Sequence, residues 1–502
     1  MTEIILGPPG TGKTTTLINL VEQELQRGVP PDRIGYFSFT KKAASEATSR
    51  AQEKFKLTKK DFPFFSTLHS MCYHQLSMKT GDVLEGARLQ EFAKYAGVRI
   101  SGRFSEDGTM VGFDVGDRIM FMENLARIRR IPLREQYDHD DDGLPWSEVD
   151  RVSRALREFK RDKGLRDYTD MLTECLDFGV TLGLEVLLID ESQDLSLTQW
   201  ALVNQLANGC RRVAVAGDDD QAIYRWAGAD VDTLIDMDGK ERVLGKSWRV
   251  PPAIQEVANS IIAPVKHRRN KTWQPRAGGE GEVGEVNHFS NVDLREGSTL
   301  VLARNSYVIR EQVEPLLRQQ GIVWERHGRS SINLRLIDGI RAWEKIRRGE
   351  TIEIAQARAM YEWMSSGRGV ARGHKTIPNV PDEQMVTEKE LRKNHGLVAP
   401  TAPWYTSLDR VPQNDIRYIR AALARGEKIS EKPRITLSTI HGAKGGEADH
   451  VVLMREMASR TYNEMLNSNG DDERRVWYVG ATRARERLTL VESTTQRRCP
   501  WL

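Results

Sequence analysis

Short runs of apolar residues alternate along this chain with segments whose apolar positions recur at helical spacing. Each run leads into polar residues, a pattern typical of strands that are buried on both faces of a parallel sheet. The predicted strands are residues 4–6, 33–39, 185–190, 212–217, 299–303, 435–438, 451–454 and 488–491. Because helices separate most of these strands, the pattern predicts an α/β fold.

Two long segments interrupt the alternation. Residues 81–165 are charged and helical in pattern, and residues 331–431 combine helical segments with a Pro- and Gly-rich stretch. We therefore expect a mainly helical insertion in each of two α/β domains. The predicted division is a first domain from 1–80 and 166–247 with insertion 81–165, and a second domain from 248–330 and 432–502 with insertion 331–431.

The first predicted strand is followed by G-P-P-G-T-G-K-T at 7–14, which fits the phosphate-loop pattern at every fixed position, and then by a helix. Glycines let backbone N–H groups close around phosphates, and the helix N-terminus adds a favourable dipole. The stretch predicts nucleoside triphosphate binding, with a chance match as the alternative. The residues expected to bind nucleotide are Gly7, Pro8, Gly10, Thr11, Gly12, Lys13, Thr14 and Thr15.

Two adjacent carboxylates follow another predicted strand, at Asp190 and Glu191. Ligands bind at the carboxyl ends of strands in open α/β sheets, so we expect both side chains near the phosphate loop. Asp190 suits Mg²⁺ coordination together with Thr14, and Glu191 suits the base that activates an attacking water. A solvated acidic turn is the alternative interpretation.

The composition narrows the class of protein. At 502 residues the chain is too long for one core. The net charge of +3 means that any nucleic-acid contact must come from local patches. The four cysteines lack C-x-x-C spacing, which argues against a disulfide framework or a zinc site. No apolar run is long enough to span a membrane and the first strand begins at residue 4, so we expect a cytoplasmic protein without a membrane segment.

The motifs at 190–194 (D-E-S-Q-D) and 217–229 (G-D-D-D-Q-A-I-Y-R-W-A-G-A) closely resemble those of UvrD/Rep-type superfamily 1 DNA helicases. Further segments resemble motifs of this family in the same order: F-T-K-K-A-A at 39–44, S-T-L-H-S at 66–70, S-W-R at 247–249, A-R-N at 303–305, T-I-H-G-A-K-G-G-E at 439–447 and T-R-A at 482–484. The resemblance runs nearly end to end. It implies two RecA-like P-loop domains that hold ATP and Mg²⁺ between them, with single-stranded DNA lying across both.

The resemblance also implies roles for single residues. Gln221 would sense the γ-phosphate, Arg249 and Arg483 would act as arginine fingers, Trp248 would stack on adenine, and Glu447 would reach the ribose. The positions implied to contact DNA are Phe39, Thr40, Thr67, His69, Tyr224, Trp226, Arg304, Thr439 and His441. Among these, Trp226 is the best base-stacking platform, because an aromatic face holds a base without reading its sequence.

The function implied by this resemblance is ATP-driven translocation on single-stranded DNA with DNA unwinding in the 3′→5′ direction. Two alternatives remain: a DNA-stimulated ATPase that displaces proteins without processive unwinding, and an ATP-gated DNA-binding switch. We expect single-stranded DNA and single-strand/duplex junctions as partners, proteins of replication or repair as further partners, and a monomer or weak self-association.

Two features qualify these expectations. The family carries an adenine-contacting glutamine motif a couple of dozen residues before the phosphate loop, whereas six residues precede Gly7, so Trp248 alone is expected to contact adenine. A basic stretch with one aromatic, at 266–273, fits a segment that follows phosphates, and an exposed surface segment is the alternative.

Overall fold

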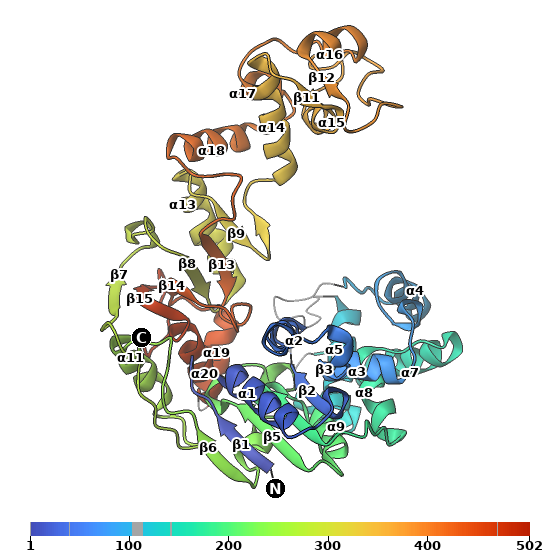
Figure 1. The fold of residues 1–502 in the computed structure, drawn as a ribbon, viewed down its shortest axis with the longest axis vertical. Coiled ribbons are helices and arrows are strands. Elements are labelled where there is room, and N and C mark those ends of the chain that lie inside the picture. The colour runs from blue at the N-terminus through green and yellow to red at the C-terminus, as the bar shows by residue number, and fades with distance from the viewer. Residues whose placement is uncertain (1, 40, 103–113, 141–142, 469) are drawn as a thin grey trace. The chain divides into compact units, whose positions relative to one another are not determined.

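The computed structural model describes residues 2–39, 41–102, 114–140, 143–468 and 470–502 (Figure 1). The chain forms two compact units. The first unit consists of Met1–Glu285, Ile440–Leu490 and Thr495–Leu502, and the second of Val286–Thr439 and Val491–Thr494. The domain boundaries expected from the sequence stay predictions, because the first unit combines parts of both predicted domains.

A six-stranded parallel sheet lies at the centre of the first unit, in the order β3-β2-β4-β5-β1-β6. Its strands are β1 (Thr2–Leu6), β2 (Ile34–Ser38), β3 (Phe65–Ser66), β4 (Val186–Asp190), β5 (Arg212–Gly217) and β6 (Lys240–Val243). Leu6 lies opposite Gly217 and Ser38 lies opposite Asp190. The carboxyl ends of β1, β5, β2 and β4 therefore line up at one edge of the sheet.

Alternate residues of these strands face two separate apolar cores, as the period of two in a strand requires. Ile5, Leu188 and Ala214 pack with α1 (Lys13–Gln26) and α2 (Lys41–Phe55) on one face. On the other face, Leu6, Ile189 and Val215 pack with α3 (Leu68–Gln75), α8 (Tyr168–Asp177) and α9 (Leu197–Ala207). The predicted fold class, α/β with parallel strands, is confirmed.

The first unit also contains the strands β14 (Ala448–Met454), β15 (Ala484–Val491) and β7 (Glu282–Val286), which are neighbours in that order. Among the helices beside them, α11 (Pro252–Ile262) packs on α20 (Asp471–Ala481). The other helices here are α10 (Asp232–Ile235) and α19 (Ser459–Asn467). Helix α20 contacts the short turn Asp219–Gln221, which follows β5. A helix from the C-terminal part of the chain therefore packs at the carboxyl edge of the six-stranded sheet.

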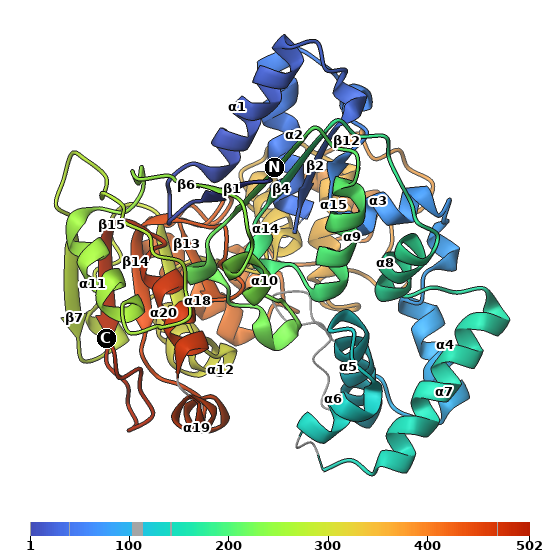
Figure 2. The ribbon, with the colours of Figure 1, turned by 90° about the horizontal axis from the view of Figure 1, so that it is seen from below.

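The segment expected as the first helical insertion contains α4 (Gly86–Ala96), α5 (Val115–Ile128), α6 (Leu133–His139) and α7 (Trp146–Lys163), which gather together in Figure 2. The helical pattern predicted for residues 81–165 is confirmed for the described part of this segment. An apolar core that includes Phe92, Ile119, Val152 and Phe159 joins these helices.

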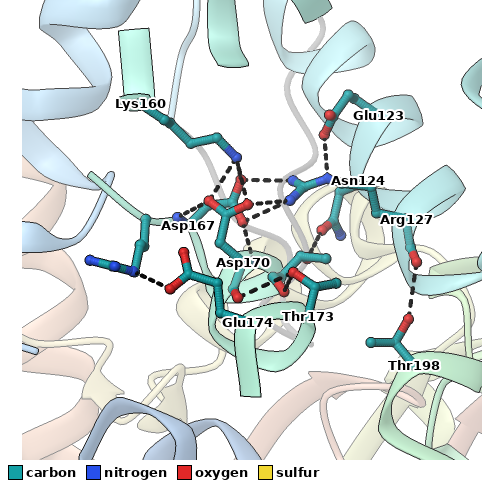
Figure 3. Close-up of polar contacts among 11 residues, drawn as sticks. Glu123, Asn124, Arg127, Lys160, Asp167, Asp170, Thr173, Glu174 and Thr198 are labelled. Carbon is teal, nitrogen blue, oxygen red and sulfur yellow. Dashed lines mark hydrogen bonds and ion pairs between the residues drawn. The ribbon is translucent and has the colours of Figure 1, made fainter. Parts of the chain in front are cut away.

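A buried ion-pair network fastens this insertion to α8 (Figure 3). Arg127 on α5 lies 2.8 Å from Glu123, 2.7 Å from Asp167 and 2.9 Å from Asp170, and Lys160 on α7 lies 2.7 Å from Asp167. Although burial raises it, the pKa of Asp167 stays below its usual value because Arg127 and Lys160 stabilise the charged carboxylate. Three helices are therefore tied together through one set of shared charges.

The second unit contains a sheet in the order β10-β9-β13-β8, in which β9, β13 and β8 are parallel and β10 is antiparallel to β9. The bounds are β8 (Thr299–Ala303), β9 (Trp324–Arg326), β10 (Arg329–Ser330) and β13 (Ile435–Thr439). Its helices are α12 (Ser306–Val308), α13 (Glu314–Gln319), α14 (Leu334–Arg347), α15 (Ile354–Glu362), α16 (Glu388–Asn394), α17 (Trp404–Ser407) and α18 (Gln413–Ala424). In Figure 1, α14 to α17 cluster with a two-stranded antiparallel sheet made of β11 (Ile352–Glu353) and β12 (Met385–Val386).

Short turns complete the described secondary structure. The 3₁₀ turns are Pro31–Arg33, Lys59–Asp61, Thr80–Asp82, Ser192–Asp194, Asp219–Gln221, Arg225–Ala227 and Phe289–Asn291, and one π turn spans Ile309–Val313. Within the described ranges, no helix has both the length and the apolar composition needed to cross a bilayer.

The ion-pair network leads to the first testable prediction. Replacing Arg127 by Met leaves one buried and two largely buried carboxylates with one cation fewer. Breaking a buried ion pair costs about 3–5 kcal/mol. We expect Arg127→Met to lower the free energy of unfolding by that amount in urea denaturation. The control is Arg154→Met, because Arg154 pairs with Asp150 on the exposed face of α7 and should contribute almost nothing. Equal losses in the two variants would contradict the prediction.

Candidate functional site

The loop between β1 and α1 is held by its own hydrogen bonds. The Gly7 N–H donates to the Gly217 carbonyl at 2.9 Å, and the Thr11 hydroxyl donates to the Pro8 carbonyl at 2.8 Å. Lys13 folds back so that its Nζ donates to the Gly7 carbonyl at 3.0 Å. Gly12, at φ +84°, precedes the first residue of α1, and no acidic residue lies in the first turn of that helix. The N-terminus of α1 therefore carries no competing carboxylate.

Gly10 of this loop leaves no space for a side chain. A Cβ on Gly10 would lie 2.5 Å from the Cβ of Arg249. The loop is this close to Arg249 because the preceding residues bind it directly: the Ser247 hydroxyl donates to the Pro9 carbonyl at 2.7 Å, and the Trp248 N–H donates to the Gly10 carbonyl at 2.8 Å. The segment 247–249, which resembles a family motif, thus packs on the phosphate loop.

Asp190 is buried at the carboxyl edge of the sheet. Its Oδ2 accepts hydrogen bonds from the Thr14 hydroxyl at 2.8 Å and from the Tyr36 hydroxyl at 2.6 Å. Burial raises the pKa of Asp190, and the neighbouring charge of Glu191 raises it further. A hydroxyl beside a carboxylate is the kind of oxygen pair that Mg²⁺ uses, so Thr14 and Asp190 fit that ion. Tyr36 was not among the residues predicted for the site.

Glu191 is held in the left-handed backbone region at φ +53°, a conformation that non-glycine residues adopt at a cost. Its carboxylate lies 3.8 Å from the Lys13 Nζ and accepts a hydrogen bond from the Gln193 amide. Although burial raises it, the pKa of Glu191 is held below its usual value by Lys13, then by Lys444, with a smaller effect of Arg483. Cations from three segments therefore act on one carboxylate.

Arg483 is buried, and its guanidinium donates only to neutral acceptors among the described residues: the carbonyls of Val479 (3.0 Å) and Gly446 (3.4 Å) and the side-chain oxygen of Gln221 (2.8 Å). Burial, with Arg249 beside it, lowers the pKa of Arg483 to about 9. A buried cation without a carboxylate partner is costly. Such a group is suited to an anionic ligand.

Arg249, by contrast, forms an ion pair with Glu447, and Arg485 lies 2.5 Å from the same carboxylate. Burial raises the pKa of Glu447, but Arg249 and Arg485 outweigh this effect and lower it. The predicted arginine finger and the predicted ribose contact thus neutralise each other. Nearby, the Trp248 ring is 68% exposed, and the Lys246 Nζ lies 4.6 Å from its centroid.

Lys444 joins three parts of the site, although the sequence analysis gave it no role. Its Nζ donates to Asp194 at 2.7 Å and to the Gln221 carbonyl at 2.8 Å, and lies 5.1 Å from the centroid of the Tyr224 ring. Burial raises the pKa of Asp194 to about 6, against the opposing effect of Lys444. The residue could be found only from the fold, because its partners are distant in sequence.

Five aromatic side chains form a continuous group that we call the aromatic row: Phe39, Tyr224, His441, Trp226 and Phe121. Successive ring centroids lie 5.7, 6.1, 6.0 and 6.4 Å apart. The Tyr224 hydroxyl donates to the His441 carbonyl at 3.0 Å, and the Trp226 side chain is partly exposed. Phe121 comes from α5, and its apolar position in a helix gave no sign of this placement.

The remaining residues predicted to contact DNA are in separate places. Thr67 is buried and caps α3, since its hydroxyl oxygen accepts the Ser70 N–H at 3.2 Å. The His69 ring packs edge-on against Tyr168. Arg304 and Thr439 belong to the second unit, at the carboxyl ends of the neighbouring strands β8 and β13. Thr40 lies outside the described residues.

Two other predicted features have a clear outcome. Thr15 is exposed on the first turn of α1, where Arg50 donates to its hydroxyl at 3.4 Å. The interpretation of 266–273 as a segment that follows phosphates is wrong for Arg268 and Lys271, because both cations bind Asp220 inside the first unit. Among the described residues, no group of three or more His, Cys, Asp or Glu side chains could hold a metal ion.

Two separate parts of this chain match models of known protein families. A family model described as an AAA domain matches residues 1–227, and a model described as a UvrD-like helicase C-terminal domain matches residues 414–495. The C-terminal match thus makes this part of the chain similar to UvrD-like helicases. The resemblance and the two RecA-like domains that the motifs predicted are therefore confirmed.

The proteins to which this chain is similar differ in how much of their length is matched. The ATP-dependent DNA helicase PcrA of Staphylococcus epidermidis is 25% identical over 296 residues, which is 55% of this chain and 40% of the relative. PcrA of Staphylococcus aureus is 24% identical over 318 residues, 60% of this chain and 42% of the relative. The chain thus spans less than half the length of these relatives. DNA helicase II of Rickettsia typhi is 23% identical over 631 residues, 98% of this chain and 90% of the relative.

The packing of Gly10 against Arg249 leads to a testable prediction. Gly10→Ala should lower the free energy of unfolding by about 1–2 kcal/mol for the left-handed backbone, and by about 1–3 kcal/mol more for the clash. Gly28→Ala is the matched control, because Gly28 has a similar φ of +86° but no atom within 4 Å of an added Cβ. Urea denaturation of both variants measures the difference. Equal destabilisation would contradict the role of the close contact.

Proposed function

We propose that this chain is an ATP-dependent translocase on single-stranded DNA and a DNA helicase that moves 3′→5′. The observation that carries the proposal is the buried Arg483, whose described acceptors are all neutral. The positive charge of Arg483 suits an anionic ligand. Arg483 and the phosphate-loop residue Lys13 both lower the pKa of the same carboxylate, Glu191. The terminal phosphate of ATP is the anion that suits this arrangement.

The first step of the proposed mechanism is nucleotide binding. The phosphates occupy the loop 7–14, where Lys13 exchanges the Gly7 carbonyl for the β/γ-phosphates. Adenine stacks on the exposed face of Trp248. Thr14 and Asp190 would hold Mg²⁺, and the ion would supply positive charge beside the phosphate oxygens.

The second step is hydrolysis. Glu191 is ionised, because three cations lower its pKa, and accepts a proton from the attacking water. Gln221 and Arg483, already hydrogen-bonded to each other, contact the γ-phosphate. Arg249 leaves Glu447 for the developing negative charge, and Glu447 is then available to the ribose. Nucleotide binding therefore exchanges an internal ion pair for a contact with substrate.

The third step couples turnover to DNA. The aromatic row offers sequence-independent stacking, with Trp226 as its most accessible member among the predicted DNA contacts. Lys444 contacts both the Gln221 carbonyl and the Tyr224 ring. A movement of Gln221, the proposed γ-phosphate sensor, would therefore be transmitted through Lys444 to the aromatic row. Alternating grip on the strand then becomes directed stepping.

Other parts of the proposal are broader. We retain the domain division predicted from the sequence and propose single-strand/duplex junctions as the working substrate. Replication or repair proteins are the proposed partners, the proposed state is a monomer or a weakly associating one, and the proposed location is the cytoplasm. Arg304, Thr439 and Thr40 stay among the proposed DNA contacts, on the family resemblance alone.

The central test is steady-state ATPase activity with and without single-stranded DNA. We expect strong stimulation by single-stranded DNA, and unwinding of a duplex with a 3′ tail in preference to one with a 5′ tail. Glu191→Gln should keep nucleotide binding and lose most turnover, because the amide cannot accept the proton. Glu22→Gln, an isosteric change in a surface pair with Lys54, is the control and should behave as wild type.

Each outcome of this test has a meaning. ATPase activity that DNA does not stimulate would overturn the translocase proposal. Stimulated ATPase without strand displacement, together with removal of a DNA-bound protein, would favour the protein-displacing motor. DNA affinity that depends on ATP with almost no turnover would favour the ATP-gated switch.

The proposed stacking role of Trp226 predicts a loss of DNA affinity. Trp226→Ala should weaken binding of a fluorescent oligothymidine by about 1–3 kcal/mol, or about 5- to 150-fold, measured by anisotropy. Phe178→Ala is the control, because Phe178 is an exposed aromatic, 68% accessible, at the end of α8 and outside the aromatic row. Unchanged affinity in Trp226→Ala would remove this residue from the DNA path.

A further inference from the structure

The segment 266–274 follows α11 and contains no helix, yet its residue Lys271 is fixed in the interior. Lys271 is buried, and its Nζ lies 2.9 Å from Asp218, 3.0 Å from Asp220 and also within hydrogen-bonding distance of Asp219. We call these three carboxylates the aspartate cluster. One lysine therefore serves three consecutive acidic side chains.

Neighbouring residues complete the contacts of the aspartate cluster. Arg268 forms a two-point ion pair with Asp220, and the Arg269 N–H donates to the Asp219 carboxylate at 2.9 Å. Arg475, buried on α20, donates to the Asp219 carbonyl at 3.0 Å and to the His267 carbonyl at 2.8 Å. Lys271 and Arg268 are thus the two side-chain cations recorded on these carboxylates within the described residues.

The far end of the segment reaches the phosphate loop. The Ser247 N–H donates to the Gln274 carbonyl at 2.9 Å, and the Gln274 N–H donates to the Gly245 carbonyl at 2.8 Å. Ser247 in turn binds the Pro9 carbonyl. Residues 266–274 therefore form a strap from the aspartate cluster to the segment that packs on the phosphate loop.

Asp218 connects this strap to the γ-phosphate sensor. Its Oδ1 lies 2.9 Å from the Lys271 Nζ, while its Oδ2 accepts the Gln221 side-chain amide at 2.6 Å. The oxygen of that amide accepts Arg483 at 2.8 Å. The side chains thus form a chain in the order Lys271, Asp218, Gln221, Arg483. Without Lys271, the Oδ1 of Asp218 keeps only the Asp220 N–H, at 3.3 Å. The carboxylate is then held less firmly beside Gln221.

We propose that Lys271 is a positioning residue for ATP hydrolysis: it fixes Asp218, which orients Gln221 and through it Arg483 at the terminal phosphate. This inference rests on the proposed ATPase function. The lysine touches no substrate in this scheme. Its effect is therefore expected on turnover rather than on nucleotide affinity, because the phosphate loop and Trp248 are left intact.

The experiment measures kcat and KM for ATP at saturating single-stranded DNA, and nucleotide affinity with a fluorescent ATP analogue. We expect Lys271→Met to lower kcat at least about tenfold, since small errors of geometry are costly in turnover. KM and nucleotide affinity should change less than about threefold. Lys271→Arg, which keeps charge and donors, should retain more kcat than Lys271→Met. The exposed Lys266→Met is the control in the same segment and should match wild type.

A double variant separates positioning from stability. Lys271→Met removes one positive charge from the aspartate cluster, and a second change, Asp219→Asn, removes one negative charge without touching Gln221. Lys271→Met/Asp219→Asn should therefore regain thermal stability while kcat stays low, because Asp218 still lacks its lysine. If Lys271→Met does not fold, this balanced variant takes its place in the kinetic comparison.

The kinetic and stability results decide whether Lys271 has a positioning role. Recovery of kcat together with stability in the double variant, or an unchanged kcat in folded Lys271→Met, overturns the positioning role. A rise in KM with kcat unchanged overturns it as well, because the defect would then lie in binding. A wild-type chain without ATPase activity overturns both this inference and the proposed function, whereas an active wild type with unaffected variants overturns the inference alone.

Discussion

Charges buried at the carboxyl edge of the first sheet need partners, and the architecture of the first unit depends on how those partners are supplied. A buried ion without compensation costs several kcal/mol, so the segments that carry the partners are held where the charges require them. Asp194 is compensated by Lys444, 250 residues away, and the aspartate cluster by Lys271 and Arg268. Long-range ion pairs thus join late segments of the chain to the phosphate-loop region.

One buried charge departs from this rule. Arg483 has neutral acceptors, while the nearby Arg249 is neutralised by Glu447. The site therefore combines one cation that, among the described residues, donates to no carboxylate with another that is paired with Glu447. This combination suits a substrate that brings several negative charges at once. A protein dipole or a single carboxylate would satisfy only one of the two arginines.

Ion pairs also hold the helical insertion against the first unit's sheet domain. Its own apolar core makes it a separate cluster of helices, but Arg127 and Lys160 bind carboxylates on α8, which packs beneath the first sheet. The hydroxyl of Thr198 on α9 donates to the Arg127 carbonyl at 3.0 Å. These contacts fix α5, which places Phe121 beside Trp226. An insertion that interrupts the sequence pattern thus completes a row of side chains from the central domain.

The sequence by itself determined the features that depend on local order: the strand, glycine loop and helix around Lys13, the acidic strand end at Asp190, and the α/β class. These predictions succeeded because backbone conformation and hydrophobic periodicity depend on residues that are neighbours in the sequence. Only the tertiary structure decided that Tyr36 binds Asp190, that Arg249 pairs with Glu447, and that Lys271 is buried instead of facing phosphates. The sequence alone does not show whether a charged side chain faces solvent or a distant carboxylate. Desolvation and ion pairing arise only when remote segments of the chain pack together.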